Sequence, residues 1–406
     1  MGLQLVILAA GQGTRMASDR PKVLHEVAHA PLLHHAMRAG AALSPERTVI
    51  VTGHGGAAVA AAARAVDPGA VVVEQAERLG TAHAVSQSLP ALEGAGGHTL
   101  VFYGDTPFIG PATLEAMVVG LSDHAVMVLG FEPADPGRYG RLVRGPSGDL
   151  ERIVEYKDAS AEERAIGLCN SGVIACATEL LADLLPRIGN DNAAGEYYLT
   201  DLIGLARAEG HRAGLVVCDE AETLGVNSRA DLAAAEAAFQ ARARAQAMAA
   251  GVTLAAPGTV HFAWDTALGR DSEVEPMVVF GPGVTVETGA RIRAFSHLEG
   301  CHVSAGAVVG PYARLRPGAE IAEDARIGNF VEVKAAGIGP GAKVNHLSYI
   351  GDAEIGARAN VGAGTVTCNY DGVMKHRTEI GEGAFIGSDT MLVAPVRVGA
   401  EAMTAS

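Results

Sequence analysis

The sequence predicts an N-terminal α/β domain, a connecting helix and a C-terminal parallel β-helix. Up to about residue 227, short apolar segments alternate with helical patterns, which indicates a parallel or mixed α/β sheet. An alanine-rich segment follows, and after about residue 270 aliphatic residues recur every six positions. We therefore expect domains at residues 1–227 and 251–406, joined by a linker helix at 228–250.

The first 227 residues contain apolar segments with the length and composition of strands. They are Leu3–Ala9, Thr48–Thr52, Ala70–Glu74, Thr99–Phe102, Ala125–Phe131 and Leu215–Val217. Segments with helical patterns lie between them. These are Pro31–Ala42, Ala57–Val66, Ala82–Pro90 and Pro111–Leu121.

The predicted connecting helix has a signal at each end. Ser228 is a suitable N-cap, and Gly251 is a suitable residue just after the last turn. The alanine-rich sequence between them favours a helix strongly.

The C-terminal part follows a six-residue period, with short shifts of phase. The aliphatic residues in phase are Val274, Phe280, Val286, Ile292, Leu298, Val303, Val309, Leu315, Ile321, Ile327, Val333, Ile338, Val344, Ile350, Ile355, Val361, Ile380, Ile386, Leu392 and Val398. A helix would need a period near 3.6 and a flat strand a period of 2. A sustained period of six with Gly and Ala indicates a hexapeptide β-helix, whereas a disordered Gly/Ala-rich tail would show no regular phase.

One polar segment, Cys368–Glu379, interrupts the period. Solenoids accept insertions on one face, often the binding face. A surface loop without a role is the alternative, but the segment carries Asn369, Tyr370 and Asp371 together, which favours function.

Composition excludes several classes of protein. The formal net charge of −15 argues against nucleic acid or an anionic membrane as partner. The five cysteines form no C-x-x-C pair, so neither a zinc site nor a disulfide framework is indicated. The N-terminus lacks the basic and apolar regions of a signal peptide, and no apolar run reaches the roughly 18 residues of a membrane span. We expect a cytoplasmic enzyme.

The segment "LAAGQGTRM", residues 8–16, follows the first predicted strand. Gly11 and Gly13 allow the backbone to approach an anion closely, and Arg15 and Lys22 add two cations suited to a triphosphate. The loop is neither a Walker loop, since no Gly-Lys-Ser/Thr follows, nor a dinucleotide fingerprint, since a third glycine is missing. By itself this pattern is a weak signal, and a solvated basic pair is the alternative.

Further motifs occur in a fixed order along the chain. They are "ERLGTAHA", "YGD", "GRYGRL", "IVEYKD", "CNSG", "GEYYLTD", "GVNSR", "YARLRPGAE", "GNFVEVK", "VNHLSYIGDAEIG" and "NVGAGTVTCNYDG". With the glycine-rich loop, they closely resemble the bifunctional N-acetylglucosamine-1-phosphate uridyltransferase/glucosamine-1-phosphate acetyltransferase family over essentially the whole chain. The resemblance implies a Rossmann-like nucleotidyltransferase domain, a linker helix and a left-handed parallel β-helix of hexapeptide repeats.

The resemblance implies a uridyltransferase site for UTP and N-acetylglucosamine 1-phosphate. Residues at nucleotide-binding positions are Leu8, Ala9, Ala10, Gly11, Tyr103 and Gly104, with Gln75, Gly80 and Thr81 reading the uracil. Residues at sugar-phosphate positions are Gly140, Glu155, Asn170 and Asn227. Arg15 and Lys22 would neutralise the phosphates, and Asp105 and Asn227 would hold Mg²⁺.

The residues around Asp105 fit this role independently. Asp105 follows an apolar strand, at the edge where open α/β sheets bind ligands. Mg²⁺ prefers one or two oxygen ligands plus substrate phosphates. A helix N-cap is the alternative role for Asp105. In the implied reaction, the phosphate of N-acetylglucosamine 1-phosphate attacks the α-phosphorus of UTP and pyrophosphate leaves. Because the attacking phosphate is already anionic, no strong base is needed, and alignment and charge neutralisation suffice for catalysis.

The second half implies acetyl transfer from acetyl-CoA to glucosamine 1-phosphate. His346 is the expected base, because an imidazole titrates near neutral pH. Residues at sugar-phosphate positions are Arg316, Lys334, Tyr349 and Asn360. Residues at acetyl-CoA positions are Ala363, Asn369, Tyr370, Ser388 and Ser406.

In the family, the acetyltransferase site is assembled between neighbouring β-helices of a homotrimer, so we expect that assembly here. The chain stops in mid-repeat where relatives continue for further coils, so we expect a truncated C-terminus. The alternative function is a monofunctional sugar-phosphate nucleotidyltransferase whose β-helix only mediates assembly. His346 and the Cys368–Glu379 segment argue against it.

Overall fold

The computed structural model of the chain describes residues 2–11, 13–53 and 55–406. It divides into two compact units, residues 1–235 and 236–406. None of the helices in the described ranges is both long enough and apolar enough to cross a membrane.

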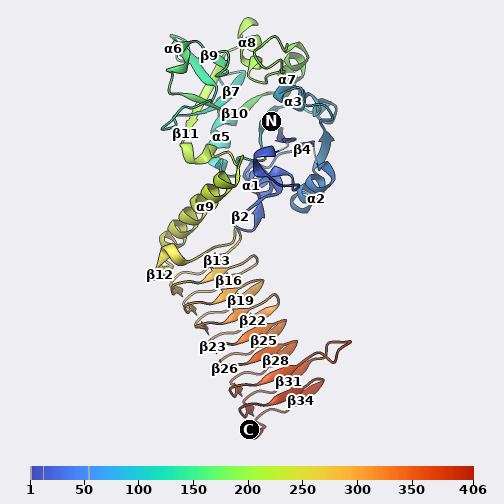
Figure 1. The fold of residues 1–406 in the computed structure, drawn as a ribbon, viewed down its shortest axis with the longest axis vertical. Coiled ribbons are helices and arrows are strands. Elements are labelled where there is room, and N and C mark those ends of the chain that lie inside the picture. The colour runs from blue at the N-terminus through green and yellow to red at the C-terminus, as the bar shows by residue number, and fades with distance from the viewer. Residues whose placement is uncertain (1, 12, 54) are drawn as a thin grey trace. The chain divides into compact units, whose positions relative to one another are not determined.

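The first unit is built on a nine-stranded sheet with the order β11-β7-β10-β6-β1-β4-β5, and β8 and β9 are attached through β10 (Figure 1). The strands are β1 (Leu3–Ala9), β4 (Arg47–Thr52), β5 (Val71–Glu74), β6 (His98–Tyr103), β7 (Val126–Phe131), β8 (Arg141–Arg144), β9 (Leu150–Val154), β10 (Cys169–Ala177) and β11 (Ala213–Cys218). A separate two-stranded ribbon pairs β2 (Glu26–Val27) with β3 (Ala30–Pro31).

Helices and short 3-10 turns connect these strands. They are η1 (Thr14–Met16), η2 (Lys22–Leu24), α1 (Leu32–Ala41), α2 (Gly56–Val66), α3 (Thr81–Ser86), α4 (Leu89–Leu92), α5 (Pro111–Gly120), α6 (Ala161–Arg164), α7 (Thr178–Leu184), η3 (Leu185–Arg187), α8 (Asp201–Ala208) and η4 (Glu220–Thr223).

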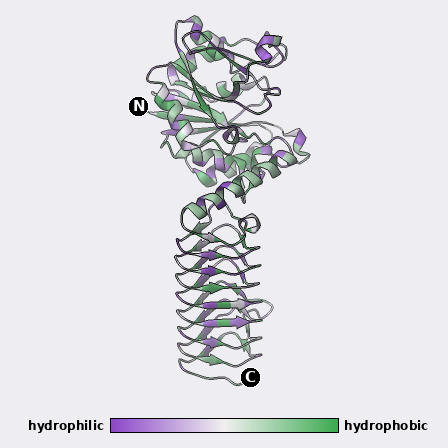
Figure 2. Ribbon diagram, turned by 90° about the vertical axis from the view of Figure 1, so that its left-hand side faces the viewer, coloured by the Kyte–Doolittle hydropathy of each residue, from purple (hydrophilic) through white to green (hydrophobic). Residues whose placement is uncertain are grey.

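Strand β1 is central in this sheet because it is apolar on both faces. Every residue of the strand is buried. Val6 and Leu8 pack into one hydrophobic cluster, while Leu5 and Ile7 pack into another. This alternation is expected for a strand covered on both sides, and Figure 2 shows the central strands as predominantly hydrophobic.

The six predicted strands are confirmed, but the pattern analysis did not predict β2, β3, β8, β9, β10, α6, α7 or α8, and one predicted helix is divided. The pattern analysis missed β10, which runs antiparallel between β6 and β7, because Asn170, Ser171 and Gly172 interrupt its apolar run. The predicted helix at 82–90 is two helices, α3 and α4. Pro90 lacks a backbone N–H and disfavours a continuous helix through the residue before it.

Helix α9 (Arg229–Ala249) begins in the first unit and ends in the second. Its predicted caps are confirmed. The Ser228 hydroxyl accepts a hydrogen bond from the Asp231 N–H at 3.2 Å, and the Asp231 carboxylate accepts one from the Ser228 N–H at 2.9 Å. Gly251, two residues after the last residue of the helix, has a left-handed φ of 89°.

The second unit is the predicted left-handed parallel β-helix, whose coils stack in Figure 1. We call its three sheets the first, second and third faces. The first face contains β12 (Thr253–Leu254), β14 (Glu273–Val274), β17 (Arg291–Ile292), β20 (Val308–Val309), β23 (Arg326–Asn329), β26 (Lys343–His346), β29 (Asn360–Val361) and β32 (Phe385–Ile386).

The other two faces have the same parallel pairing, one strand per coil. The second face contains β15 (Val279–Phe280), β18 (His297–Leu298), β21 (Arg314–Leu315), β24 (Glu332–Lys334), β27 (Tyr349–Gly351), β30 (Val366–Cys368) and β33 (Met391–Val393). The third face contains β13 (Ala267–Leu268), β16 (Thr285–Val286), β19 (Cys301–Val303), β22 (Ala319–Ile321), β25 (Ala336–Ile338), β28 (Ala353–Ile355), β31 (Thr378–Ile380) and β34 (Val396–Val398).

The aliphatic residues of the six-residue period fill the interior of the β-helix. Those from Val274 to Leu392 are at most 5% exposed, and Val398 packs against them partly buried. The segment between β30 and β31 leaves the coil as a projecting loop (Figure 1). The period therefore predicted both the core and its interruption.

Candidate functional site

Several of the residues predicted to bind the nucleotide lie at the carboxyl edge of the first unit's parallel strands. Leu8, Ala9 and Ala10 are buried at the end of β1. Leu8 pairs with Tyr103 of β6, and the Gly104 N–H donates to the Leu8 carbonyl at 3.0 Å. Two predicted nucleotide-binding segments therefore meet at one edge.

Three polar side chains from distant parts of the sequence converge beside that edge. The Lys22 ammonium, on η2, donates to a carboxylate oxygen of Asp105 and, at 3.1 Å, to the Asn227 side-chain oxygen. The backbone fixes the arrangement, because the Val226 N–H donates to the Asp105 carbonyl at 3.0 Å. Asp231 in turn accepts from the Asn227 N–H. The structure thus brings together the predicted phosphate-binding lysine and both predicted metal ligands.

These oxygens form a donor set suited to a hard cation. A carboxylate oxygen of Asp105 and the amide oxygen of Asn227 both face one positive charge, the Lys22 ammonium. In the described residues, no three His, Cys, Asp or Glu side chains cluster as for a metal. One carboxylate plus one neutral oxygen fits Mg²⁺ better than a dedicated protein cage would, since Mg²⁺ usually takes its remaining ligands from phosphates and water.

The glycine-rich loop packs against the Lys22 side chain. Gly13 has a φ of 64°, and a Cβ built on it would lie 2.7 Å from the Lys22 Cβ. A Cβ on Gly11 would lie 3.8 Å from the Lys22 ammonium nitrogen. Gln12, the middle residue of the motif, lies outside the described residues. Glycine at 13 therefore meets both a backbone requirement and a space requirement.

Arg15 differs from Lys22 in its surroundings. It lies on η1, its side chain is exposed, and no hydrogen bond joins it to the Lys22 group in the described part of the site. Its predicted role as a phosphate partner stays a prediction.

Gln75, Gly80 and Thr81 lie together as expected for a shared base-binding role. The buried Gln75 amide donates to the Gly80 carbonyl at 3.1 Å. Gly80 has a φ of 118°, and a Cβ there would lie 2.5 Å from the Tyr197 carbonyl oxygen. The Thr81 hydroxyl accepts a hydrogen bond from the Leu199 N–H at 2.9 Å, so it also supports the surrounding backbone.

The predicted sugar-phosphate residues form a second group. The Asn170 N–H donates to the Gly140 carbonyl at 2.9 Å, and a Cβ on Gly140 would lie 3.4 Å from both Glu155 carboxylate oxygens. Burial raises the pKa of Glu155, although a hydrogen bond from Thr200 opposes the shift. Burial likewise raises the pKa of Tyr103, which therefore stays protonated.

Glu155 also lines a cavity of about 500 Å³ that the sequence did not reveal. The other lining residues are Arg138, Tyr156, Lys157, Arg164 and Tyr198. The Arg164 guanidinium lies 4.7 Å from the centre of the Tyr156 ring. Tyr156 and Lys157 follow Glu155 directly in the motif "IVEYKD", so that motif was the available signal.

In the second unit, three of the four predicted sugar-phosphate residues lie on the second face. Arg316 makes an ion pair with Glu332 at 2.8 Å. Lys334, one coil further, lies 3.6 Å from Asp352. Tyr349 stands opposite Glu332 on the next strand.

A further cation, Lys375, joins this group from the projecting loop. Lys334 and Lys375 lie close enough to interact, and the neighbouring positive charge of Lys334 lowers the pKa of Lys375. Adjacent ammonium groups suit a phosphate. The sequence analysis missed Lys375, and its place five residues after Tyr370 in the interrupting segment was the only signal.

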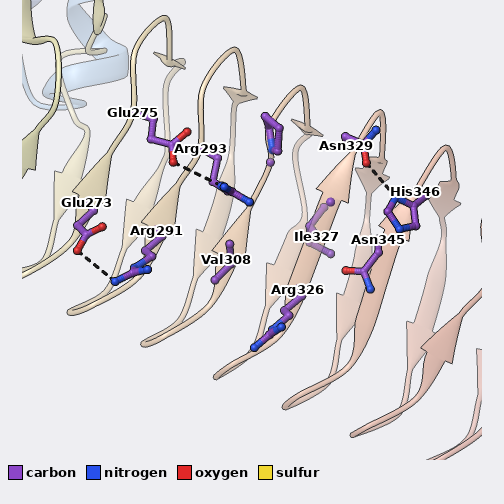
Figure 3. Close-up of a pocket in the computed structure, with 13 residues that line it drawn as sticks. Glu273, Glu275, Arg291, Arg293, Val308, Arg326, Ile327, Asn329, Asn345 and His346 are labelled. Carbon is purple, nitrogen blue, oxygen red and sulfur yellow. Dashed lines mark hydrogen bonds and ion pairs between the residues drawn. The ribbon is translucent and has the colours of Figure 1, made fainter.

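His346 lies at the end of β26 on the first face and is exposed. Its Nδ1 lies 2.9 Å from the side-chain oxygen of Asn329 in the preceding coil (Figure 3). With Nδ1–H donating to that oxygen, Nε2 keeps its lone pair and can accept a proton. Asn360 lies on β29, the neighbouring strand of the first face. It is therefore on a different face from Arg316, Lys334 and Tyr349.

Ala363, Ser388 and Ser406 continue one axial row from His346. The Gly364 N–H donates to the His346 carbonyl, and the Asp389 N–H donates to that of Ala363. A Cβ on Gly387 would lie 2.7 Å from the Ser406 nitrogen. At about 4.8 Å per coil, the row extends roughly 14 Å beyond His346. It is therefore long enough for an extended ligand.

The projecting loop is held by its own polar bonds. Asp371 accepts from the Val373 and Met374 N–H groups at 2.8 and 2.6 Å, and from His376 at 2.7 Å. Asn369 at its base is buried and donates to Asp352. Tyr370 is exposed, with its hydroxyl donating to the Gly372 carbonyl at 2.6 Å.

This fold and these groups define a nucleotidyltransferase domain carried with a hexapeptide β-helix. Residues 5–170 match the MobA-like NTP transferase domain family. The chain is 63% identical over its whole length to "Bifunctional protein GlmU" of Jannaschia sp. and 68% identical to that of Cereibacter sphaeroides, covering 89% of each relative. The chain therefore belongs to the family of bifunctional GlmU proteins.

A solved structure supports the fold of the first unit. The crystal structure of a UDP-glucose pyrophosphorylase complexed with UDP-glucose aligns with 60% of this chain and all of its own, with a TM-score of 0.50 and 19% identity. At that identity the likeness concerns the fold alone.

Proposed function

We propose that this chain makes UDP-N-acetylglucosamine by two reactions at two separate sites. Acetyl-CoA first acetylates glucosamine 1-phosphate on the β-helix. The product, N-acetylglucosamine 1-phosphate, then receives a uridylyl group from UTP in the α/β domain. The convergence of Lys22, Asp105 and Asn227 carries the second assignment, because it joins a phosphate-binding cation to the oxygens of a metal site.

In uridylyl transfer, an oxygen of the sugar phosphate forms the new bond to the α-phosphorus of UTP, and the bond to pyrophosphate breaks. Asp105 and Asn227 would hold Mg²⁺, which supplies charge neutralisation and alignment of the triphosphate. Lys22 and Arg15 bind phosphate oxygens. Gln75, with Gly80 and Thr81, orients the uracil. Gly140, Glu155 and Asn170 orient the sugar. The attacking oxygen is already anionic, so no strong base is needed.

In acetyl transfer, His346 takes a proton from the ammonium of glucosamine 1-phosphate. The free amine attacks the thioester carbonyl and the C–S bond breaks. The protonated imidazole gives its proton to the leaving thiolate, and the nitrogen of the new amide releases its remaining extra proton to solvent. Asn329 keeps Nδ1 protonated and so presents Nε2 as the base. The cations Arg316, Lys334 and Lys375 bind the phosphate, and the axial row from Ala363 to Ser406 borders acetyl-CoA.

We further propose that residues 1–227 carry the first site and 251–406 the second, with 228–250 as linker. The protein would act as a cytoplasmic homotrimer. Its partners are the small-molecule substrates UTP, acetyl-CoA and the two sugar phosphates. Family membership favours two activities over the monofunctional alternative.

The test is a paired assay on the purified 406-residue chain. Pyrophosphate release is followed with UTP, N-acetylglucosamine 1-phosphate and Mg²⁺, with and without chelator. Thiol release is followed with acetyl-CoA and glucosamine 1-phosphate. We expect both pyrophosphate release and thiol release, and we expect the chelator to stop pyrophosphate release only. Pyrophosphate release without thiol release would support the monofunctional alternative. The absence of both activities would refute the proposal.

A further inference from the structure

Arg141, the first residue of β8, is a buried cation in the first unit. Its side chain is 2% exposed, and it is the largest of the fully buried side chains in the described residues. Arginine is almost never buried so completely unless an anion pairs with it. Within the described residues, every hydrogen bond of its guanidinium goes to a backbone carbonyl oxygen and none goes to a carboxylate. Charge pairing therefore does not explain why a cation stands here.

The guanidinium of Arg141 joins two separate segments of the chain. Three of the carbonyl groups that accept its hydrogen bonds lie in the loop between β7 and β8. They are those of Pro136 at 3.2 Å, Gly137 at 3.1 Å, and Tyr139. The fourth carbonyl belongs to Arg164, the last residue of α6, and it accepts from Nε at 3.3 Å and from a terminal nitrogen at 3.4 Å. One side chain thus ties the loop and the end of α6 to the start of β8.

The sheet places the proposed sugar residues one position beyond Arg141. Arg141 pairs antiparallel with one residue of β9, Val154, and with one residue of β10, Cys169. On all three strands the next position in the same direction carries a proposed sugar residue. These are Gly140, Glu155 and Asn170. Arg141 therefore lies directly next to the three backbone positions that would hold the sugar.

Both segments that Arg141 holds also line the cavity of about 500 Å³ beside Glu155. Arg138 of the loop and Arg164 of α6 are lining residues. The Arg164 guanidinium lies 4.7 Å from the centre of the Tyr156 ring, and its Nε donates to the Tyr156 carbonyl at 3.2 Å. The Arg141 guanidinium lies 5.8 Å from the centre of the same ring. Loss of the Arg141 contacts would therefore free two walls of this cavity.

The chemistry of arginine suits it to such a role. Burial of a cation without an anion costs free energy, whereas an apolar side chain of similar volume would fill the same space without that cost. The guanidinium, however, carries five N–H donors in one rigid plane, so it can bind several carbonyl groups in fixed directions. A lysine has its donors on one nitrogen and cannot reach both segments in this way. The arrangement thus favours exact placement of the loop over stability alone.

We propose that Arg141 is a positioning residue for the sugar phosphate in uridylyl transfer. Its guanidinium fixes the loop 136–140 and the end of α6, and so sets where Gly140, Glu155 and the cavity beside them meet the sugar. The inference rests on the proposed function of the first unit. Arg141 itself is buried and acts through these residues. None of its hydrogen bonds goes to a residue proposed to bind UTP, so its loss should affect the two substrates unequally.

Two substitutions and one control test this role. Arg141→Met removes the donors at similar volume, and Arg141→Lys keeps the charge on a single nitrogen. The matched control is Arg144→Met, because Arg144 is an exposed arginine of the same strand with one hydrogen bond, to the Gly148 carbonyl at 3.0 Å. For each protein, pyrophosphate release is measured with either UTP or N-acetylglucosamine 1-phosphate varied and the other saturating. Circular dichroism and amide hydrogen exchange by mass spectrometry are measured in parallel.

In Arg141→Met, we expect the KM for N-acetylglucosamine 1-phosphate to rise by about tenfold or more and the KM for UTP to stay within about twofold. Arg141→Lys should give a smaller rise, because its single nitrogen holds only one of the two segments. In both variants, amide exchange should become faster in residues 132–140 and 161–165 and stay unchanged in β1. Arg144→Met should match wild type in every measurement.

A folded Arg141→Met variant with an unchanged KM for the sugar phosphate would overturn the proposal. Equal rises in both KM values, or a fall in kcat alone, would also overturn it, because they indicate a general structural role. If Arg141→Met does not fold, Arg141→Lys is judged by the same criteria. Faster exchange in the two segments, with uridylyl transfer absent even in wild type, would count against the proposed function and leave the hold of Arg141 on the loop supported.

Discussion

The two candidate sites are built in opposite ways. In the first unit, Lys22, Asp105 and Asn227 come from three distant segments and meet in a mostly covered group. In the β-helix, the row from Asn329 through His346 and Ala363 to Ser388 arises from one position repeated coil after coil. A convergent site depends on each of its members, whereas a repeated site depends on one base and on the row of equivalent positions beside it. The two should therefore fail independently.

The largest expected effect is that of Asp105→Ala. Uridylyl transfer should fall by about 10³-fold or more, because the cation loses its carboxylate, while acetyl transfer and assembly persist. Pyrophosphate release measures this, with the exposed Asp123→Ala as control. Retention of activity within severalfold would reject Asp105 as a metal ligand.

His346→Ala should cause the converse loss. Acetyl transfer should drop by about 10²- to 10⁴-fold without its base, and uridylyl transfer should stay unchanged. The control is His297→Ala, an exposed histidine on the second face. A folded variant that loses both activities would contradict the independence of the two sites.

Gly13→Ala should have an intermediate effect. A Cβ would both oppose the left-handed backbone and displace Lys22, so unfolding free energy should fall by roughly 1–2 kcal/mol and uridylyl transfer by about tenfold. Gly94→Ala is the matched control, because Gly94 has a φ of 72° and nothing within 4 Å of its Cβ position. Equal activity loss in both variants would show that backbone strain, and not Lys22, is responsible.

The smallest effect concerns Glu155→Gln. Burial raises the pKa of Glu155 above the ordinary 4.5, so ionisation costs the folded state stability at pH values above that raised pKa. The variant should unfold about 1–3 °C higher at pH 7 and lose this advantage as the pH falls below 4.5, while its KM for the sugar phosphate rises. Thermal melts at several pH values, with the exposed Glu93→Gln alongside, measure this. An unchanged melting temperature at pH 7 would contradict it.

Sequence periodicity predicted the two kinds of element unequally. The β-helix core was predictable because each coil repeats one chemical requirement, an aliphatic residue that fills a narrow interior. Strand β10 was not, because Asn170, Ser171 and Gly172 break its apolar pattern. Contacts between residues far apart in the sequence, such as Lys22 and Asn227, leave no local signal. They could be predicted only from the family resemblance. Lys375 escaped notice for the same reason, since only the folded loop brings it beside Lys334.

The projecting loop has a consequence for engineering. Ala353 and Ile355 before it pair directly with Thr378 and Ile380 after it, so the coil resumes its stacking as if nothing had intervened. Asp371 secures the loop's turn by contacts within the loop itself. The loop is thus a cassette with fixed anchor points: arms of other lengths or chemistries could be grafted between Asn369 and Thr378 without resetting the register of the scaffold.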